Sequence, residues 1–307
     1  MMRNDSGPVP MLVAAAAIFL LSVMDAVIKS LSATYGTLQI VHMRYLGGAA
    51  VSLAVVLALR SAWPSWSSIR ANALRALFMI TTALSFFYSV SVLPLAEAVA
   101  LSFMAPLFMA LIARWLLGEP IRRSILTAIL LGLSGVAVIL QSKITLGVLD
   151  GRTLSGLAAA LTSAVAYAFA MVLVRRQTAT DSVEIITFLS ASLGWLLLLP
   201  VTAFLTIFGE GIGVPAREFS FVAIGTADIL LIISLGVLGT GGHLLLTWAY
   251  ARAHAARLAV LEYTAFIWAG AIGMVVFGET PSVWTFAGAG LIIAGCLIAA
   301  RPSATKS

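Results

Sequence analysis

The residues of this sequence with the most obvious chemistry are a few ionisable side chains inside long apolar runs. Glu262 lies in the run 256–277, next to Tyr263 and Thr264. A charged side chain at the centre of a membrane-spanning helix costs roughly 2.5 to 3.5 kcal/mol on insertion scales, so each one needs a partner or a function. No basic residue lies within one turn of Glu262 on its own run, and a carboxyl group in an apolar site can exchange a proton at physiological pH. We expect Glu262 to bind a proton or a solute, or else to be a structural carboxylate hydrogen-bonded to a neighbouring helix.

Three further charged residues lie in the first two apolar runs. Asp25 and Lys29 are four positions apart, so they share one face of a helix and can neutralise each other. This spacing predicts either a structural ion pair, with the lysine reaching toward the outer surface, or a polar lining of an outer gate. Arg44 lies about two turns into the second run. We expect it either to bind an anionic group of a solute or to pair with Asp25.

The composition defines the environment of these residues. The chain has 307 residues, of which 61% are hydrophobic and 10% charged, and its mean hydropathy is +1.08. Such a chain has too little polar surface to cover a soluble globule, so we predict an integral membrane protein. At about 20 apolar residues per span, the length allows roughly ten membrane-spanning helices and no soluble catalytic domain. The net charge of +6 is interpreted as membrane topology rather than nucleic-acid binding.

Apolar runs bounded by charges, glycine or proline predict ten membrane spans. They are 9–31, 37–59, 71–93, 95–117, 124–141, 154–174, 184–208, 227–250, 256–277 and 283–300. With the amino terminus in the cytoplasm, 13 of the 18 Lys and Arg residues lie on the inner face, Arg75 among them, whereas Lys143, Arg152 and Arg217 lie on outer loops. This distribution predicts a multi-pass protein of the cell inner membrane with both termini in the cytoplasm.

The second half of the chain repeats the first. When residues 85–119 are aligned with 245–279, Gly118-Glu119 coincides with Gly278-Glu279. The charges around the two copies differ in sign, because Glu97 aligns with Arg257. Five spans per half place equivalent loops on opposite sides of the membrane, and the positive-inside rule then requires this exchange. We therefore predict inverted repeats, and we expect the Gly-Glu pairs to end helices and fix their packing rather than to contact substrate.

The repeated segments resemble the EamA unit of the drug/metabolite transporter superfamily. The resemblance rests on the run 101–120 and its counterpart 261–280, and it extends over nearly the whole chain. It implies an all-α integral membrane protein with ten transmembrane helices, arranged as two inverted five-helix repeats at 1–146 and 147–307 around a central cavity. Phe266 stands where Pro106 aligns, so the two halves need not bend alike.

Aromatic side chains are further candidates for the substrate site. Tyr88, Phe103, Tyr263 and Trp268 lie on the repeated segments that we expect to line the cavity. Their large apolar rings favour an aromatic or heterocyclic solute. Cys296 is the single cysteine of the chain, and we expect it to be a small packing residue.

His243 follows the sequence Gly239-Thr240-Gly241-Gly242 in the eighth predicted span. Glycines permit a hinge or close helix packing there, so the histidine is expected to act in gating or proton relay, or to be a packing residue. The quartet Gly132-Leu133-Ser134-Gly135 resembles the nucleophile motif of rhomboid proteases, which makes an intramembrane serine protease using Ser134 and His243 an alternative. Small residues at this spacing are common where helices touch, and the aligned second copy has Ala294 in place of Ser134.

Together these observations predict a secondary transporter that moves a small organic metabolite by alternating access. The resemblance implies a solute such as an amino acid, a vitamin like riboflavin, a nucleoside or an S-adenosylmethionine-like compound. The sequence has no Walker loop, so coupling to protons or solute exchange is expected. We expect a lipid bilayer as the surroundings and no cofactor, metal or nucleic acid. The sequence is compatible with a homodimer but does not predict one. A passive channel and a non-transporting membrane scaffold are the remaining alternatives.

Overall fold

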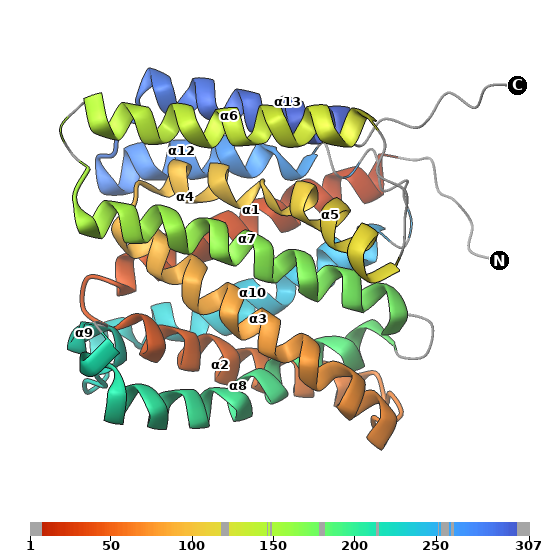
Figure 1. Ribbon diagram of the computed structural model, residues 1–307. Coiled ribbons are helices and arrows are strands. Elements are labelled where there is room, and N and C mark those ends of the chain that lie inside the picture. Colours follow the sequence, from red (N-terminus) through yellow and green to blue (C-terminus); the bar gives the residue numbers. More distant parts are fainter. Residues whose placement is uncertain are drawn as a thin grey trace, which may run out of the picture.

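The chain folds into a bundle of long helices that lie side by side (Figure 1). The computed structural model describes residues 8–117, 123–145, 147, 149–177, 182–212, 215–250, 252, 258 and 261–299. All regular secondary structure within these ranges is helical. Gly118, Glu119 and Arg257, which the repeat alignment uses, lie outside them.

The helices follow the predicted apolar runs closely. The first half of the chain forms α1 (Val9–Leu31), α2 (Thr37–Ala58), α3 (Trp66–Val92), α4 (Leu95–Ser102), α5 (Ala105–Leu117) and α6 (Arg123–Thr145). The second half forms α7 (Gly151–Gln177), α8 (Val183–Phe208), α10 (Ile229–Tyr250), α12 (Thr264–Phe277) and α13 (Val283–Ala299). Three short helices lie between α8 and α10, namely η1 (Glu210–Ile212), α9 (Ala216–Phe219) and η2 (Thr226–Asp228).

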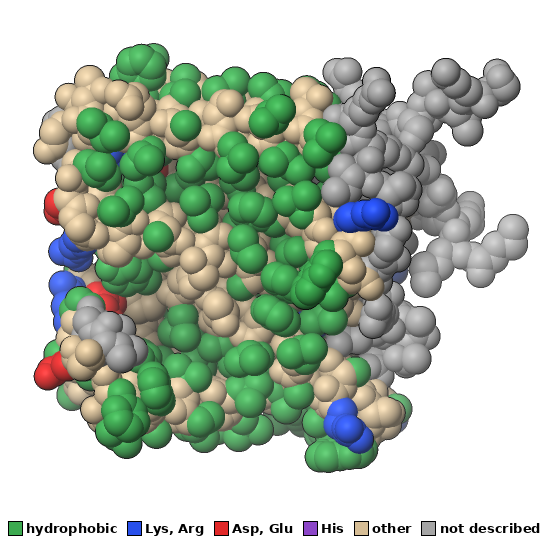
Figure 2. All heavy atoms as spheres, in the orientation of Figure 1, with side chains coloured by type: hydrophobic (Ala, Val, Ile, Leu, Met, Phe, Trp, Pro, Cys, Tyr) green, Lys and Arg blue, Asp and Glu red, His purple; other side chains and the backbone are tan. Residues whose placement is uncertain are grey.

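The lengths and the surface of these helices suit a membrane. Eight segments of the described residues are long and apolar enough to cross one, and α4 and α5 together form one of the eight. The helices α12 and α13 are shorter and also apolar. Figure 2 shows hydrophobic side chains over the face between the two ends of the bundle, with charged side chains gathered at the ends. The prediction of an all-α integral membrane protein is confirmed.

The two halves pack against each other in a way that follows the repeat. Helix α1 packs against α10, and its counterpart in the second half, α7, packs against α3, the counterpart of α10. Equivalent helices also meet directly, in the pairs α2–α8 and α6–α13. Helices α1 and α7 start from opposite ends of the bundle (Figure 1). The arrangement is that of two inverted repeats with interleaved helices.

Both halves contain a helix break at the same position of the repeat. In the first half, a turn at Phe103 and Met104 separates α4 from α5. In the second half, residues 261 and 262 are helical, Tyr263 lies in a turn and α12 starts at the next residue. The two turns tighten through hydrogen bonds between residues three apart, from the Met104 N–H to the Leu101 oxygen (3.1 Å) and from the Phe266 N–H to the Tyr263 oxygen (3.2 Å). Both halves therefore turn at this position, although Phe266 stands where Pro106 aligns.

One end of the bundle carries a cover of its own. At the end where α1 stops and α2 begins, called here the α1–α2 end (left in Figure 1), the segment 209–228 packs over the α1–α2 turn. Arg217 donates hydrogen bonds to the backbone oxygens of Ser32 and Ala33, at 2.7 and 2.8 Å. The Tyr35 hydroxyl lies 2.8 Å from the Asp228 carboxylate. These bonds fix the cover to the first two helices.

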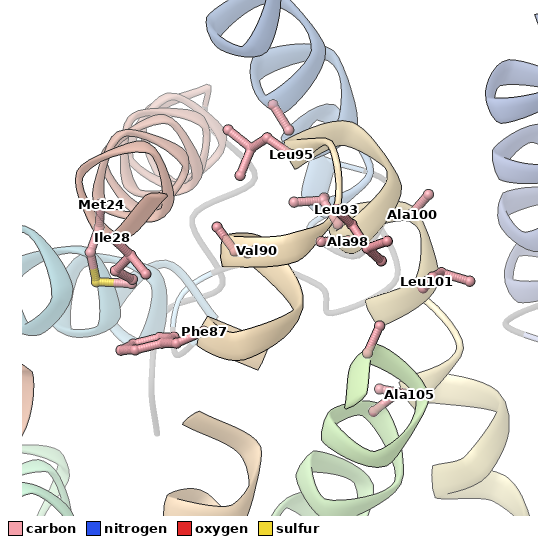
Figure 3. Close-up of a cluster of buried hydrophobic side chains, with 14 of the residues drawn as sticks. Met24, Ile28, Phe87, Val90, Leu93, Leu95, Ala98, Ala100, Leu101 and Ala105 are labelled. Carbon is pink, nitrogen blue, oxygen red and sulfur yellow. The ribbon is translucent and has the colours of Figure 1, made fainter. Parts of the chain in front are cut away.

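The apolar core extends across both halves. Figure 3 shows part of it, where Met24 and Ile28 of α1 lie near Phe87 and Val90 of α3, with residues of α4 beyond. Helices α2 and α10 approach most closely through Gly47 and Gly236. A Cβ atom on Gly236 would lie only 2.7 Å from the Gly47 backbone, so the absence of side chains allows this crossing. The crossing brings the polar residues of α2 next to α10.

Candidate functional site

Asp25 and Arg44 lie at the same depth in the bundle. Asp25 is six residues before the end of α1, and Arg44 is seven residues after the start of α2. At 1.5 Å per residue both lie roughly 10 Å from the α1–α2 end. Their charges interact. Among the described residues, however, Asp25 and Arg44 form no ion pair within 4 Å. The structure thus brings Asp25 toward Arg44 rather than into a pair with Lys29.

Arg44 rests on a surface made of glycine. A Cβ atom on Gly239 of α10 would lie 2.4 to 2.5 Å from three atoms of the Arg44 guanidinium, and one on Gly48 of α2 would lie 2.7 Å from a fourth. The space left by these missing side chains is occupied by the guanidinium group. Gly239 of α10, together with Gly48 of α2, therefore leaves room for a cation, which adds to the hinge or packing role expected from sequence.

His243 stands one turn beyond Gly239 on α10. Its Nδ1 lies 2.7 Å from the Gly239 backbone oxygen, and its charge state is influenced by both Arg44 and Arg75. The imidazole is nevertheless exposed, and the Asp25 and Arg44 side chains are only half-buried. Polar side chains from α1, α2 and α10 thus keep accessible surface at membrane depth.

Arg75 of α3 is the functional candidate that sequence reasoning missed. Its side chain is 8% exposed, and it donates a hydrogen bond through Nη1 to the Ser190 hydroxyl of α8. Its charge also interacts with Tyr45 and Tyr167. The sequence analysis placed Arg75 on the inner face, which is wrong, because α3 begins at Trp66 and buries it in the third turn. Ser65 is the signal that was overlooked, since its side chain accepts a hydrogen bond from the Ser68 N–H and caps the helix.

Glu262 and Tyr263 lie at the helix break of the second half. The half-buried Glu262 side chain interacts electrostatically with Tyr167 of α7 and with Tyr263. The Tyr263 ring meets the Phe103 ring edge to face, with centroids 5.2 Å apart. Cys296, buried as expected for a packing residue, donates its thiol to the Phe103 backbone oxygen at 3.1 Å. The two helix breaks and α13 therefore meet at one point.

Tyr88 and Trp268 each contact a residue of another helix. The Tyr88 hydroxyl lies 2.8 Å from the Ser155 hydroxyl and links α3 to α7. Trp268 packs edge to face against Phe19 of α1, with ring centroids 4.9 Å apart, and remains 38% exposed. Neither side chain has a recorded contact with Arg44 or Arg75 in the described part of the chain.

Lys29 joins the two halves at the α1–α2 end. Its Nζ lies 2.7 Å from a Glu279 carboxylate oxygen, and it donates to the backbone oxygens of Val90 (3.0 Å) and Leu93 (2.6 Å). The other Glu279 oxygen accepts a hydrogen bond from the Leu95 N–H at 2.8 Å. A cation near the end of α3 and an anion at the start of α4 both match the helix dipoles. The predicted Asp25–Lys29 pair is wrong, because a carboxylate distant in sequence lies closer to the lysine.

Gly278 and Glu279 confirm the expectation that the Gly-Glu pair ends a helix. Gly278 has a positive φ of 66°, and the Glu279 N–H donates back to the Gly273 oxygen at 3.0 Å. A left-handed residue that ends a helix in this way is favoured to be glycine. The same turn presents the Glu279 carboxylate to Lys29.

A second ion pair lies at the same end. Lys143 and Glu97 are 2.8 Å apart, and Thr285 of α13 donates to the same Glu97 oxygen at 3.1 Å. Lys143 belongs to the last turn of α6 rather than to an outer loop as predicted. Both pairs tie helices together, and the described residues contain no group of three or more potential metal ligands.

Ser134, the serine of the protease-like quartet, lies where helices pack together. The Ser134 hydroxyl donates to the Leu130 oxygen one turn back on α6, at 2.9 Å. A Cβ atom on Gly132 would contact Leu107 and Met104, and one on Gly135 would contact Gly288 of α13. The quartet therefore follows the rule that small residues lie where membrane helices touch.

These features define a polytopic helical membrane protein built from two related halves, with charged residues between them. The chain belongs to the EamA-like transporter family, whose model matches residues 9–141 and 154–301. It is 28% identical over 298 residues to the pseudopaline exporter CntI of Pseudomonas aeruginosa, which covers 94% of this chain and 95% of the relative. It is 30% identical over 233 residues to an uncharacterized transporter of Helicobacter pylori, covering 73% of this chain and 70% of the relative.

A solved structure shares the fold. One crystal structure superposes with a TM-score of 0.61 at 22% identity and covers 96% of this chain and 98% of that chain. The family and these relatives make the protein a membrane transporter. They indicate no catalytic family, which argues against the protease alternative.

Proposed function

We propose that the protein is a secondary transporter that moves a small organic metabolite across the cytoplasmic membrane by alternating access. The observation that carries this proposal is the pair of helix breaks at equivalent positions of the two halves. Interrupted helices at corresponding positions of inverted repeats are the best structural pointer to the binding site of a secondary transporter. Here the breaks meet at Phe103 and Tyr263, beside Glu262.

The charged residues between the halves support a solute pathway. Ionisable side chains at membrane depth are costly, and transporters retain them to bind solutes or ions. We assign Arg44, Asp25 and His243 to the pathway, because they keep accessible surface there. We assign Glu262 to proton coupling, with solute exchange as the alternative.

The substrate class of the proposal is a small organic metabolite, in the range of amino acids, nucleosides, vitamins such as riboflavin and S-adenosylmethionine-like solutes. The name of the Pseudomonas relative, a pseudopaline exporter, favours export as the direction. The break region contains the Phe103 and Tyr263 rings, which suits a solute with a flat apolar part.

The proposal includes the topology derived from the charges. Both termini lie in the cytoplasm, and the repeats occupy residues 1–146 and 147–307. The two segments matched by the family model, 9–141 and 154–301, lie on either side of that boundary and support it. The α1–α2 end then faces outward, with its segment 209–228 as an outer cover.

The test is transport by the purified protein in liposomes. A thermal-shift screen against a metabolite library identifies solutes that bind, because a ligand stabilises the state to which it binds. Each binding solute is then radiolabelled and offered to proteoliposomes with and without an imposed pH gradient. We expect at least one of them to accumulate or exchange faster than in empty liposomes.

Ser134→Ala provides a matched control for this experiment. Its hydroxyl bonds only to its own helix, so the variant should transport like the wild type. The transport proposal fails if none of the binding solutes crosses faster than in empty liposomes.

A further inference from the structure

Arg75 is a buried cation whose neighbours leave part of it unsatisfied. The side chain is 8% exposed, and its Nε is buried without a hydrogen-bond acceptor among the described residues. Its recorded hydrogen bond runs from Nη1 to the Ser190 hydroxyl. The edge of the guanidinium formed by Nε and Nη2 therefore keeps donors for which the described chain supplies no acceptor.

The charge of Arg75 also lacks a carboxylate within ion-pair distance in the described part of the chain. The side chains of Tyr45 and Tyr167 interact with it electrostatically. Arg44 has the Asp25 carboxylate as an electrostatic partner, although this pair too lies beyond ion-pair distance. Burying an unpaired charge is costly in a protein interior, so Arg75 favours an anion that pairs with it.

The residues around Arg75 place it in the same polar region as the proposed solute pathway. Tyr167 interacts with Arg75 and also with Glu262, and His243 is influenced by both Arg75 and Arg44. Side chains of α2, α3, α7 and α10, together with the second helix break, therefore share one region.

We propose that Arg75 binds an anionic oxygen group, a carboxylate or a phosphate, of the transported solute. The inference rests on the proposed transport function and adds the substrate class. Nε–H and Nη2–H form a planar edge that donates two parallel hydrogen bonds to such a group, a geometry that lysine cannot reproduce. Because Nε is buried in this conformation, solute binding would favour a conformation in which that edge is open, and this couples binding to the change of state.

The proposal is tested with paired probes that differ in one anionic group. The pairs are L-leucine and L-leucinamide, L-histidine and L-histidinamide, nicotinate and nicotinamide, adenosine and AMP, and riboflavin and FMN, together with every ligand from the library screen and its uncharged analogue. Thermal shift and titration on the wild type should show that the member carrying the carboxylate or phosphate binds and that its partner without this group does not. The first three pairs report a carboxylate and the last two a phosphate, so the comparison separates the two sources of the same chemistry.

Four variants separate binding from structure. Arg75→Gln should raise the Kd of the anionic ligand on the order of 100-fold, and Arg75→Lys by less, because it keeps the charge without the planar edge. Ser190→Ala removes the protein partner of Arg75 and should leave the discrimination intact. Arg70→Gln changes an exposed arginine on the same helix and should bind like the wild type.

The inference is overturned if no anionic probe binds the wild type, if neutral and anionic partners bind equally, or if Arg75→Lys and Arg75→Gln keep wild-type affinity. Should Arg75→Gln fail to fold, as judged by helix content and gel filtration, the wild-type pairs and Arg75→Lys still decide. These outcomes are distinct from failure of the transport proposal. If the transported solute is neutral, the transport proposal holds and the anion site at Arg75 is contradicted. If an anion binds at Arg75 but never crosses the membrane, the anion site holds and the transport proposal is contradicted.

Discussion

Phe103 and Tyr263 occupy equivalent positions of the two halves, and their rings touch edge to face with centroids 5.2 Å apart. Each residue lies in the turn that interrupts its helix. Two elements related by a pseudo-twofold axis can meet at equivalent residues only near that axis, so the axis passes close to this contact. A movement of one half against the other would change this contact first.

The ring contact should therefore carry measurable coupling. We expect Phe103→Leu and Tyr263→Leu to show an interaction free energy of about 0.5 to 1.5 kcal/mol in a double-mutant cycle of thermal unfolding. Both single variants should also slow transport more than they weaken binding, since the contact lies between the moving halves. Tyr263→Phe is the control, because it keeps the ring and removes only the hydroxyl near Cys296. Additive effects on stability would contradict the prediction.

Gly239→Ala should displace Arg44. The new methyl group would lie 2.4 to 2.5 Å from the guanidinium, and overpacking of this kind costs about 1 to 3 kcal/mol. We expect reduced binding of the solute together with a lower melting temperature. Gly241→Ala, two positions along the same helix, has no atom within 4 Å of its added methyl and should behave like the wild type. Equal effects of the two alanines would show that helix propensity, not the arginine, is responsible.

Arg44 itself should affect anionic solutes selectively if it contacts substrate. We expect Arg44→Ala to weaken anionic ligands by roughly tenfold, the equivalent of about 1.4 kcal/mol, and neutral ones less. Titration of both kinds of ligand measures this difference. Asp25→Asn in the same background tests the alternative role as a structural partner. If Arg44→Ala loses neutral and anionic ligands alike, and Asp25→Asn restores stability, the arginine is structural.

Breaking the Lys29–Glu279 pair should destabilise the bundle. Glu279→Gln removes the charge that accepts from Lys29 and weakens the bond to the Leu95 N–H. Charge-assisted hydrogen bonds contribute about 1.5 to 3 kcal/mol, so a loss on the order of 2 kcal/mol is expected in thermal unfolding. Glu218→Gln, a carboxylate on the cover segment bonded to Thr37, serves as comparison and should cost less. A Glu279→Gln protein as stable as the wild type would rule out a structural role for the pair.

Glu262→Gln tests proton coupling. If this carboxyl group carries the proton, the wild-type rate should depend on the pH gradient and the variant's rate should not. Glu184→Gln at the start of α8, which accepts a hydrogen bond from Ser61, should keep the wild-type response. Proteoliposome uptake at several imposed gradients gives the answer, and an unchanged pH response in Glu262→Gln assigns the coupling elsewhere.

The sequence predicted the helices and the repeat well because both depend on patterns along the chain. Apolar runs of membrane length define the helices, and residues 160 positions apart define the repeat. The breaks at Phe103 and Tyr263 were not predicted, because both lie inside continuous apolar runs. Charged pairs are different, because their partners come from other helices. Lys29 binds Glu279, 250 positions away, rather than the nearby Asp25, and no periodicity of α1 contains that information.

Arg75 shows how a small error in a helix end changes a functional assignment. With the third span starting at residue 71, Arg75 appears at the membrane surface, but α3 starts five residues earlier at Trp66. Five residues of helix correspond to roughly 7.5 Å of depth. That distance separates a surface arginine that reports topology from a buried one that faces the interior.

The position of Glu279 has a consequence for the assembly of the protein during synthesis. The corner between α3 and α4 belongs to the first half, yet the carboxylate that binds the Leu95 N–H and neutralises Lys29 follows α12. A ribosome completes the first half well before it makes residue 279. Lys29 and the start of α4 are therefore inserted into the membrane before this partner exists. The first half reaches its final form only after α12 and the turn that follows it have been made.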